Sequence, residues 1–269
     1  MPRNSRNSTE HRESPPAPSR RAALTSIAAW ASAVALSLTV SCHARTEPGD
    51  SNGSEAPNTA SEVVQSRGSS ARDTIQNRGP IVAFLGDSIT AGLHIPVEAA
   101  YPAVLGDELR ALDLPIQVVN AGVSGDTTAG GRTRLAWILR QKPDVLVIEL
   151  GANDGLRGIP LAVIRDNLRA IVTEALTANA RVLLLGMRLP PNYGEAYTRG
   201  FAALYDELAE ELAVPVVPHF MDGVAGVPEL NLPDGIHPTA AGHEILARNI
   251  APALRSILEE RARGRTPAR

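Results

Sequence analysis

The sequence predicts an α/β fold: a single three-layer α/β/α domain on a five-stranded parallel sheet, as in flavodoxin-like proteins. Two observations support this prediction. Short, continuous apolar runs, typical of strands buried on both faces, alternate along the chain with segments in which apolar residues recur at helical spacing. Strands that alternate with amphipathic helices imply a parallel sheet covered by helices on both sides. The domain is expected to span residues 80–260, an ordinary length for one domain.

Five strands are expected, and the first is the clearest. Residues 81–85 read Ile-Val-Ala-Phe-Leu and are followed by Gly86. Similar apolar runs lie at residues 116–119, 145–150, 182–185 and 214–217. Helices are expected where apolar residues share one helical face. These apolar stripes run from Tyr101 to Leu112, from Ile164 to Ala175, from Phe201 to Leu212 and from Leu246 to Leu258.

The composition excludes several classes of protein. The chain has 269 residues, a formal net charge of −3 and 1 cysteine. Cys42 alone cannot form an internal disulfide, and it excludes a zinc or iron–sulfur cluster held by cysteines. The nearly balanced charge argues against a nucleic-acid-binding protein, which normally has a basic face. No cluster of histidines and carboxylates suggests a metal site. We therefore expect no metal, no cofactor and no nucleic-acid partner, and we expect a monomer.

The residues that precede the domain are expected to serve export. A basic start is followed at residues 22–41 by an uncharged run rich in Ala, Leu and Val. This is the layout of a secretory signal or a membrane anchor, which we assign to residues 1–41. Residues 42–79 are rich in Ser, Glu, Asn, Pro and Gly, and we expect a disordered polar tether there. Residues 261–269 are expected to form a basic tail.

Cys42 falls at the end of the apolar run, where a bacterial lipoprotein carries its lipidated cysteine. Leu38 lies four residues before it, whereas a leucine three residues before is usual. The alternative is an ordinary unpaired cysteine near a cleavage site. On either interpretation we expect an exported protein, periplasmic or attached to the membrane and facing the periplasm or exterior.

The carboxyl ends of parallel strands are where a site is expected, because loops converge there. Ser88 follows the first strand in the sequence GDS, Gly125 lies in GVSGD, and Asn153 lies in GANDG. Asp234 and His237 share the proline-flanked loop LPDGIHP. Each has a structural alternative when taken singly: Ser88 as a helix N-cap, Asp234 as a turn residue, and His237 as a capping or surface histidine.

The order and content of these four blocks resemble the SGNH hydrolases, also called the GDSL esterase and lipase family, across residues 80–258. The stretches VVNAGVSGDTTAGG, ELGANDGLRG and RLPPNYG are similar to the small, single-domain bacterial branch of periplasmic arylesterases, acyl-CoA thioesterases and lysophospholipases. Ile89 stands where the family name has leucine, which is a conservative apolar change.

The resemblance implies a catalytic triad of Ser88, His237 and Asp234. It also implies an oxyanion hole made by the backbone N–H groups of Ser88 and Gly125 with the side-chain amide of Asn153. A serine hydroxyl needs a base to take its proton, and a carboxylate beside that base holds the imidazole in the required tautomer. The expected activity is hydrolysis of small aryl or acyl esters and thioesters, lysophospholipids among them, through an acyl-enzyme. The expected partner is therefore a small-molecule ester or thioester.

Two other functions remain open at this point. The same triad would serve a carbohydrate O-acetyl esterase. A surface-tethered binding protein would retain the fold without turnover, although the intact catalytic set weighs against it.

Neighbouring polar residues are interpreted as structural. Asp87 and Asp154 are expected to shape their turns, and His243 is expected at the surface or as a helix cap. His219 follows the last strand but has no carboxylate partner at short spacing.

The segment GMRLPPNYG, residues 186–194, follows the fourth strand and is expected to flank the site. Met187, Leu189, Pro190 and Tyr193 are candidates for contact with an acyl chain or an aromatic leaving group. The alternative is that they only pack the loop.

Overall fold

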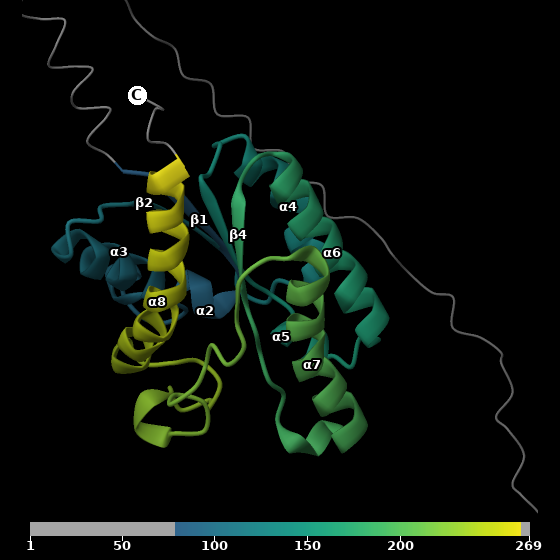
Figure 1. Cartoon of the computed structure of the whole chain (residues 1–269). Coiled ribbons are helices and arrows are strands. Elements are labelled where there is room, and N and C mark those ends of the chain that lie inside the picture. The colour runs from purple at the N-terminus through teal and green to yellow at the C-terminus, as the bar shows by residue number, and fades with distance from the viewer. Residues whose placement is uncertain (1–78, 265–269) are drawn as a thin grey trace, which may run out of the picture. The chain divides into compact units, whose positions relative to one another are not determined.

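A computed structural model describes residues 79–264 of the chain (Figure 1). The expected signal or anchor segment, Cys42 and almost all of the expected tether lie outside the described residues. The last helix continues to Gly264, so the first residues of the expected basic tail are helical. Within residues 79–264, no helix combines the length and the apolar character that a membrane span requires.

The sheet has five parallel strands in the order β2-β1-β3-β4-β5. They are β1 Ile81–Gly86, β2 Gln117–Gly122, β3 Val145–Glu149, β4 Arg181–Leu185 and β5 Val216–Val217. This order is that of flavodoxin-like sheets, in which the chain starts near the centre and reverses its winding once. The predicted fold class is confirmed.

Helices cover both faces of this sheet (Figure 1). Helices α3 and α8 pack together on one face, and α4, α6 and α7 lie on the other. Short helices α2 and α5 stand directly after β1 and β3. The helices are α2 Ser88–Ala91, α3 Tyr101–Ala111, α4 Thr128–Leu139, α5 Ala152–Leu156, α6 Leu161–Thr177, α7 Glu195–Leu212 and α8 Ala240–Gly264, with short 3-10 turns at Val97–Ala99, Pro191–Tyr193 and Pro228–Leu230.

The edge strand β5 is shorter than the sequence predicted. Of the expected residues 214–217, Val216 and Val217 pair with β4, and both are half-buried. Pro215 still accepts a hydrogen bond from Leu184 N, but its own nitrogen carries no hydrogen to donate. The strand is therefore limited to two residues on the outside of the sheet, where proline is tolerated.

Helix α4 was absent from the sequence prediction, because its apolar stripe is interrupted by glycine. Its buried positions are Thr128, Gly131, Leu135 and Ile138. A Cβ on Gly131 would lie 2.3 Å from Leu150 Cδ1, so glycine is what allows this helix to pack closely against the end of β3. Periodicity of large apolar residues does not reveal a helix that packs through glycine.

His243 joins α8 to α3. Its ring is stacked on Tyr101, with ring centroids 6.2 Å apart, and its Nδ1 accepts a hydrogen bond of 3.1 Å from the backbone N–H of Tyr101. Tyr101 is the first residue of α3, so its N–H has no acceptor within that helix. His243 was expected at the surface or as a cap; it is buried, and it caps a neighbouring helix instead of its own.

Acidification is expected to weaken this contact. Burial, with a smaller contribution from the charge of His237, lowers the pKa of His243 to about 4 from 6.5. Between these pH values the unfolded chain binds the proton and the folded chain does not, so stability falls as the pH is lowered from about 6.5 to about 4. The full effect is about 3 kcal/mol.

The variant His243→Asn keeps an acceptor near Tyr101 N but cannot be protonated. It should be less stable than wild type at pH 8, because a ring is lost from the core, and should lose less stability on acidification. Urea unfolding of both proteins from pH 8 to pH 4 measures the difference. If the stability of both proteins falls equally on acidification, His243 is not the group that causes the loss.

Candidate active site

Ser88 stands at the point where β1 ends and α2 begins. Asp87 is the N-cap of α2, and its Oδ1 accepts a hydrogen bond from Ile89 N at 3.0 Å. This cap shapes a helix of four residues and turns Ser88 toward the carboxyl edge of the sheet. Ser88 is 7% exposed, so its hydroxyl lies in a nearly closed setting.

Ser88, His237 and Asp234 form one chain of hydrogen bonds. Ser88 Oγ lies 2.8 Å from His237 Nε2, and His237 Nδ1 lies 2.8 Å from Asp234 Oδ2. The geometry is that of a nucleophile with a base and a residue that orients the base. The structure thus brings together all three residues that the resemblance implied.

Asp234 is held as an anion. Its Oδ1 accepts hydrogen bonds from the backbone N–H groups of His237 and Ile236, at 3.0 and 2.9 Å. These two bonds, together with the bond to the His237 side chain, keep the pKa of Asp234 well below its usual value. The carboxylate therefore stays charged behind the imidazole over the whole neutral range.

The loop that carries these two residues is braced from within. Leu232 N donates to His237 O at 2.7 Å, and Asn231 forms an isolated bridge with Pro238. Gly235 has a φ of +70°, which glycine adopts without strain. Backbone contacts within the loop therefore hold Asp234 and His237 close together.

The backbone N–H groups of Gly125 and Ser88 lie at the carboxyl edge of the sheet. Gly125 lies at the tip of a turn closed by the bond from Asp126 N to Val123 O (3.0 Å), and its φ of +77° requires glycine. Within residues 79–264, the N–H groups of Gly125 and Ser88 have no recorded acceptor. Both are thus available to a ligand.

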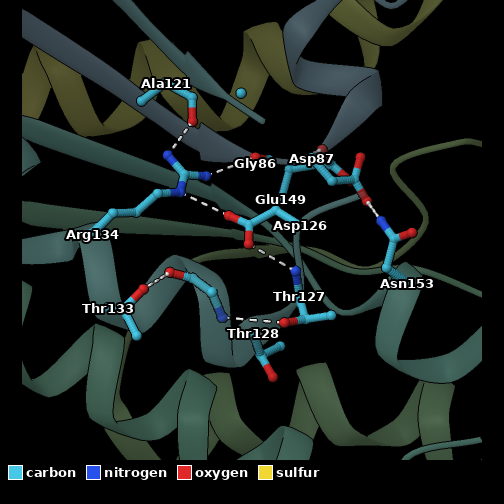
Figure 2. A network of polar contacts seen from close by, with 12 residues as sticks. Gly86, Asp87, Ala121, Asp126, Thr127, Thr128, Thr133, Arg134, Glu149 and Asn153 are labelled. Atoms are coloured by element: carbon cyan, nitrogen blue, oxygen red, sulfur yellow. Dashed lines mark hydrogen bonds and ion pairs between the residues drawn. The ribbon is translucent and has the colours of Figure 1, made fainter. Parts of the chain in front are cut away.

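Asn153 is partly committed. Its Nδ2 donates to Asp87 Oδ2 at 2.9 Å, as Figure 2 shows. A side-chain amide has two N–H groups, so one remains for a ligand. Asp87 therefore serves two donors: it caps the helix that starts with Ser88, and it orients Asn153.

A second carboxyl group, which the sequence analysis missed, lies beneath Asp87. Glu149 ends β3 and is fully buried. Its Oε2 accepts from Thr90 Oγ1 at 2.8 Å and from Asp87 N at 3.2 Å, and Thr90 Oγ1 is also bonded to the Tyr101 hydroxyl. Its Oε1 has no hydrogen-bond partner among the described residues. The sequence analysis missed Glu149 because it lies within the apolar run 145–150, and no sequence motif marks a buried acid in a strand.

Burial determines which of Asp87 and Glu149 carries a charge. It raises the pKa of Glu149 well above the usual value, and the neighbouring Asp87 charge raises it further. Burial also raises the pKa of Asp87, but hydrogen bonds from Ile89, Glu149 and Asn153 oppose that shift. We conclude that Glu149 is the group that keeps its proton. An uncharged carboxyl also tolerates one unpartnered oxygen better than a carboxylate does.

Asp154 has the structural role that the sequence indicated. Its two oxygens accept from Thr128 N and Thr128 Oγ1, at 2.9 and 2.6 Å. It thereby ties α5, which carries Asn153, to the start of α4. His219 is bonded through Nε2 to the guanidinium of Arg188 and lies on the exposed surface.

The segment 186–194 divides into two parts. Met187 is 5% exposed and belongs to the hydrophobic core, which favours the packing interpretation for this residue. Leu189 is half-buried, Pro190 is exposed, and the Tyr193 hydroxyl donates to Leu156 O at 3.1 Å. Among residues 79–264, no three acidic, histidine or cysteine side chains are grouped as a metal site.

Comparisons with known proteins agree with this geometry. The profile of the GDSL-like lipase/acylhydrolase family matches residues 84–245. Esterase TesA of Pseudomonas aeruginosa is 41% identical over 186 residues, which cover 69% of this chain and 92% of that protein. Thioesterase 1/protease 1/lysophospholipase L1 of Escherichia coli is 41% identical over 176 residues, covering 65% of this chain and 83% of that protein. A crystal structure of TesA matches with a TM-score of 0.64 at 41% identity, covering 66% of this chain and 99% of that one.

Replacing the buried acid by its neutral isostere tests its protonation. The free carboxyl ionises near pH 4.5, whereas the folded chain keeps the proton to higher pH. The contribution of Glu149 to wild-type stability should therefore fall as the pH rises above about 4.5, so Glu149→Gln should gain stability relative to wild type over this range. The two proteins should diverge by about 1.4 kcal/mol per pH unit in this range.

Urea unfolding at a series of pH values measures this divergence. The exposed Glu229→Gln is the matched control and should follow wild type. If Glu149→Gln shows the same pH slope as wild type, Glu149 is ionised in the folded protein.

Proposed function

The chain belongs to the GDSL-like lipase/acylhydrolase family and is a carboxylic ester hydrolase. From this premise we propose that it hydrolyses small aryl and acyl esters and thioesters, lysophospholipids included, with Ser88 as the nucleophile. The observation that carries the proposal is the bonded chain from Ser88 Oγ through the His237 ring to Asp234.

The first half of the reaction forms an acyl-enzyme. Ser88 Oγ attacks the ester carbonyl carbon while its proton passes to His237 Nε2. The carbonyl oxygen becomes an oxyanion in the tetrahedral intermediate. When the intermediate collapses, the bond to the alcohol or thiol breaks, and His237 returns the proton to that leaving group. The acyl group stays on Ser88.

The second half releases the acid. Water gives a proton to His237 and attacks the acyl carbon, and collapse of this intermediate returns the proton to Ser88 Oγ. Asp234 holds the ring so that Nε2 faces Ser88 and stabilises the imidazolium that forms twice in the cycle. Its low pKa supports this role, because it must remain charged throughout.

The oxyanion is assigned to the N–H groups of Ser88 and Gly125 and to the second N–H of Asn153. Removal of one such donor costs about 10²–10³ in kcat in a well-studied serine hydrolase. Leu189, Pro190 and Tyr193 remain candidates for contact with the acyl chain or the leaving group, on the loop that follows β4.

Ser88→Ala tests the nucleophile. The full chain should hydrolyse p-nitrophenyl esters from acetate to octanoate and the corresponding thioesters, and Ser88→Ala should lower kcat by about 10³-fold or more. The exposed Ser256→Ala on α8 should match wild type. Wild-type rates no higher than those of Ser88→Ala would overturn the proposal. A strong preference for acetylated sugars would instead favour a carbohydrate O-acetyl esterase.

We also propose that the protein is exported and attached to the membrane through Cys42. The basic start, the uncharged run 22–41 and the position of Cys42 at its end support this proposal. Expressed in a bacterium, the full chain should sediment with membranes, and Cys42→Ser should release it to the soluble fraction. An unchanged membrane fraction in Cys42→Ser would rule out lipidation and favour a peptide anchor.

A further inference from the structure

The loop that presents the Gly125 N–H has few contacts of its own. Residues 123–127 leave the end of β2, and the first three of them are exposed. One backbone bond, from Val123 N to Gly86 O (3.0 Å), ties the start of the loop to β1. A donor must lie within a few tenths of an ångström of its place to stabilise an oxyanion, so this loop needs a further tether.

Arg134 of α4 supplies such a tether. Its Nε donates to Asp126 Oδ2 at 2.7 Å, one terminal nitrogen donates to Ala121 O at 2.5 Å, and the other donates to Gly86 O at 2.9 Å. Figure 2 shows the guanidinium reaching these groups together. One planar side chain therefore binds the ends of β1 and β2 and the residue that follows Gly125.

The ion pair is largely withdrawn from water. The side chains of Arg134 and Asp126 are 21% and 9% exposed, so solvent screens their attraction less than that of a surface pair. A guanidinium presents donors in a rigid planar fork, whereas a lysine ammonium is a single point charge on a flexible stem. Arg134 uses three of these donors on acceptors from three segments, a geometry that lysine cannot reproduce.

Asp126 also contacts the first turn of α4, so it links the Arg134 contacts to the start of that helix. Its Oδ1 accepts from Thr127 N at 2.9 Å, and Thr127 caps α4 through a bond to Gly130 N. A Cβ on Gly130 would lie 1.8 Å from Asp126 Oδ1, so glycine makes room for this carboxylate. The residue after Gly125 is thus held by Arg134 from one side and by the first turn of α4 from the other.

The second arginine near the loop is a weaker candidate. Arg157 donates one hydrogen bond to Gly125 O, at 3.1 Å, and is exposed. A single hydrogen bond from an exposed side chain contributes little to holding the Gly125 loop in place.

We propose that Arg134 is a positioning residue of the oxyanion hole, which sets the Gly125 N–H against Ser88 by clamping Asp126 to the ends of β1 and β2. The inference rests on the proposed function. Arg134 touches no reacting atom, so its loss should act on the transition state more than on substrate binding.

Kinetics of Arg134→Ala test this role. With p-nitrophenyl butyrate, kcat should fall by about 100-fold, as for loss of one oxyanion donor, while KM changes by less than about threefold. Arg134→Lys should stay at least about tenfold below wild type, because one ammonium cannot replace the fork. Added millimolar guanidinium should restore part of the activity of Arg134→Ala. The matched control is Arg140→Ala, an exposed arginine at the end of the same helix, which should equal wild type with and without guanidinium.

Hydrogen exchange supplies a readout that does not depend on activity. The amides of residues 123–127 should exchange faster in Arg134→Ala than in wild type, while those of the interior strand β1 keep their protection. Asp126→Asn preserves the shape of the side chain and serves if Arg134→Ala fails to fold. It should lower kcat as well, and the double variant Asp126→Asn with Arg134→Lys should be no slower than the slower single variant.

The outcomes separate the two proposals. A wild-type chain without Ser88-dependent hydrolysis would overturn the proposed function, whatever the exchange rates are. Unchanged exchange of residues 123–127 in Arg134→Ala would overturn the clamp. Faster exchange with wild-type kcat, or a loss expressed in KM alone, would overturn its role in the oxyanion hole.

Discussion

The hydrogen bond between Ser88 and His237 joins two residues that lie 149 positions apart, and the rest of the site depends on it. Ser88 follows the second strand from one edge of the sheet, and His237 precedes the last helix. They meet because α8 packs beside α3 on the same face. His243, six residues after His237, accepts the first N–H of α3 and so anchors the start of α8 near the triad. The packing of α8 against α3 thus holds the segment that carries His237 on the same side of the sheet as Ser88.

Three carboxyl groups near Ser88 are controlled in different ways. Asp234 lies in a partly exposed loop and is surrounded by N–H donors, which keeps its pKa low and its charge in place. Glu149 is fully buried, which raises its pKa and favours the neutral form. Asp87 accepts hydrogen bonds from Ile89 and Asn153, and these partly offset the effect of burial on its pKa. The same chemical group is therefore an anion beside the His237 ring at Asp234 and is kept neutral by burial at Glu149.

The elements that carry the proposed catalytic groups are too short to hold themselves in place. Helix α2 has four residues and α5 has five, and the Gly125 loop is largely exposed. Helices of this length are unstable alone, so polar contacts to the sheet and to longer helices position them. Asp154 ties α5 to α4, Arg134 ties the loop to the ends of β1 and β2, and Asp87 ties Asn153 to the start of α2.

Sequence patterns were sufficient for the fold class, and the resemblance to a known family indicated candidate residues for the site. Apolar runs separated by helical stripes predicted the parallel sheet, and the resemblance of four sequence blocks to the SGNH hydrolases indicated Ser88, Gly125, Asn153, Asp234 and His237. The secondary-structure predictions failed where neither apolar periodicity nor a sequence motif marks the element or its length. Helix α4 packs through Gly131, and β5 is shortened by Pro215.

The tertiary structure alone decided which groups are buried and which partners they find. Glu149 fell within an expected apolar strand, His243 was expected at the surface or as a helix cap, and the sequence analysis did not single out Arg134. Each has at least one partner far away in the sequence: Thr90 for Glu149, Tyr101 for His243 and Gly86 for Arg134, at separations of 59, 142 and 48 residues. Burial and hydrogen bonding between distant segments depend on how the elements pack, whereas strand and helix patterns depend on neighbours along the chain. The sequence by itself therefore determined the fold class and indicated the candidate site residues, and packing determined their burial, their charges and their hydrogen-bond partners.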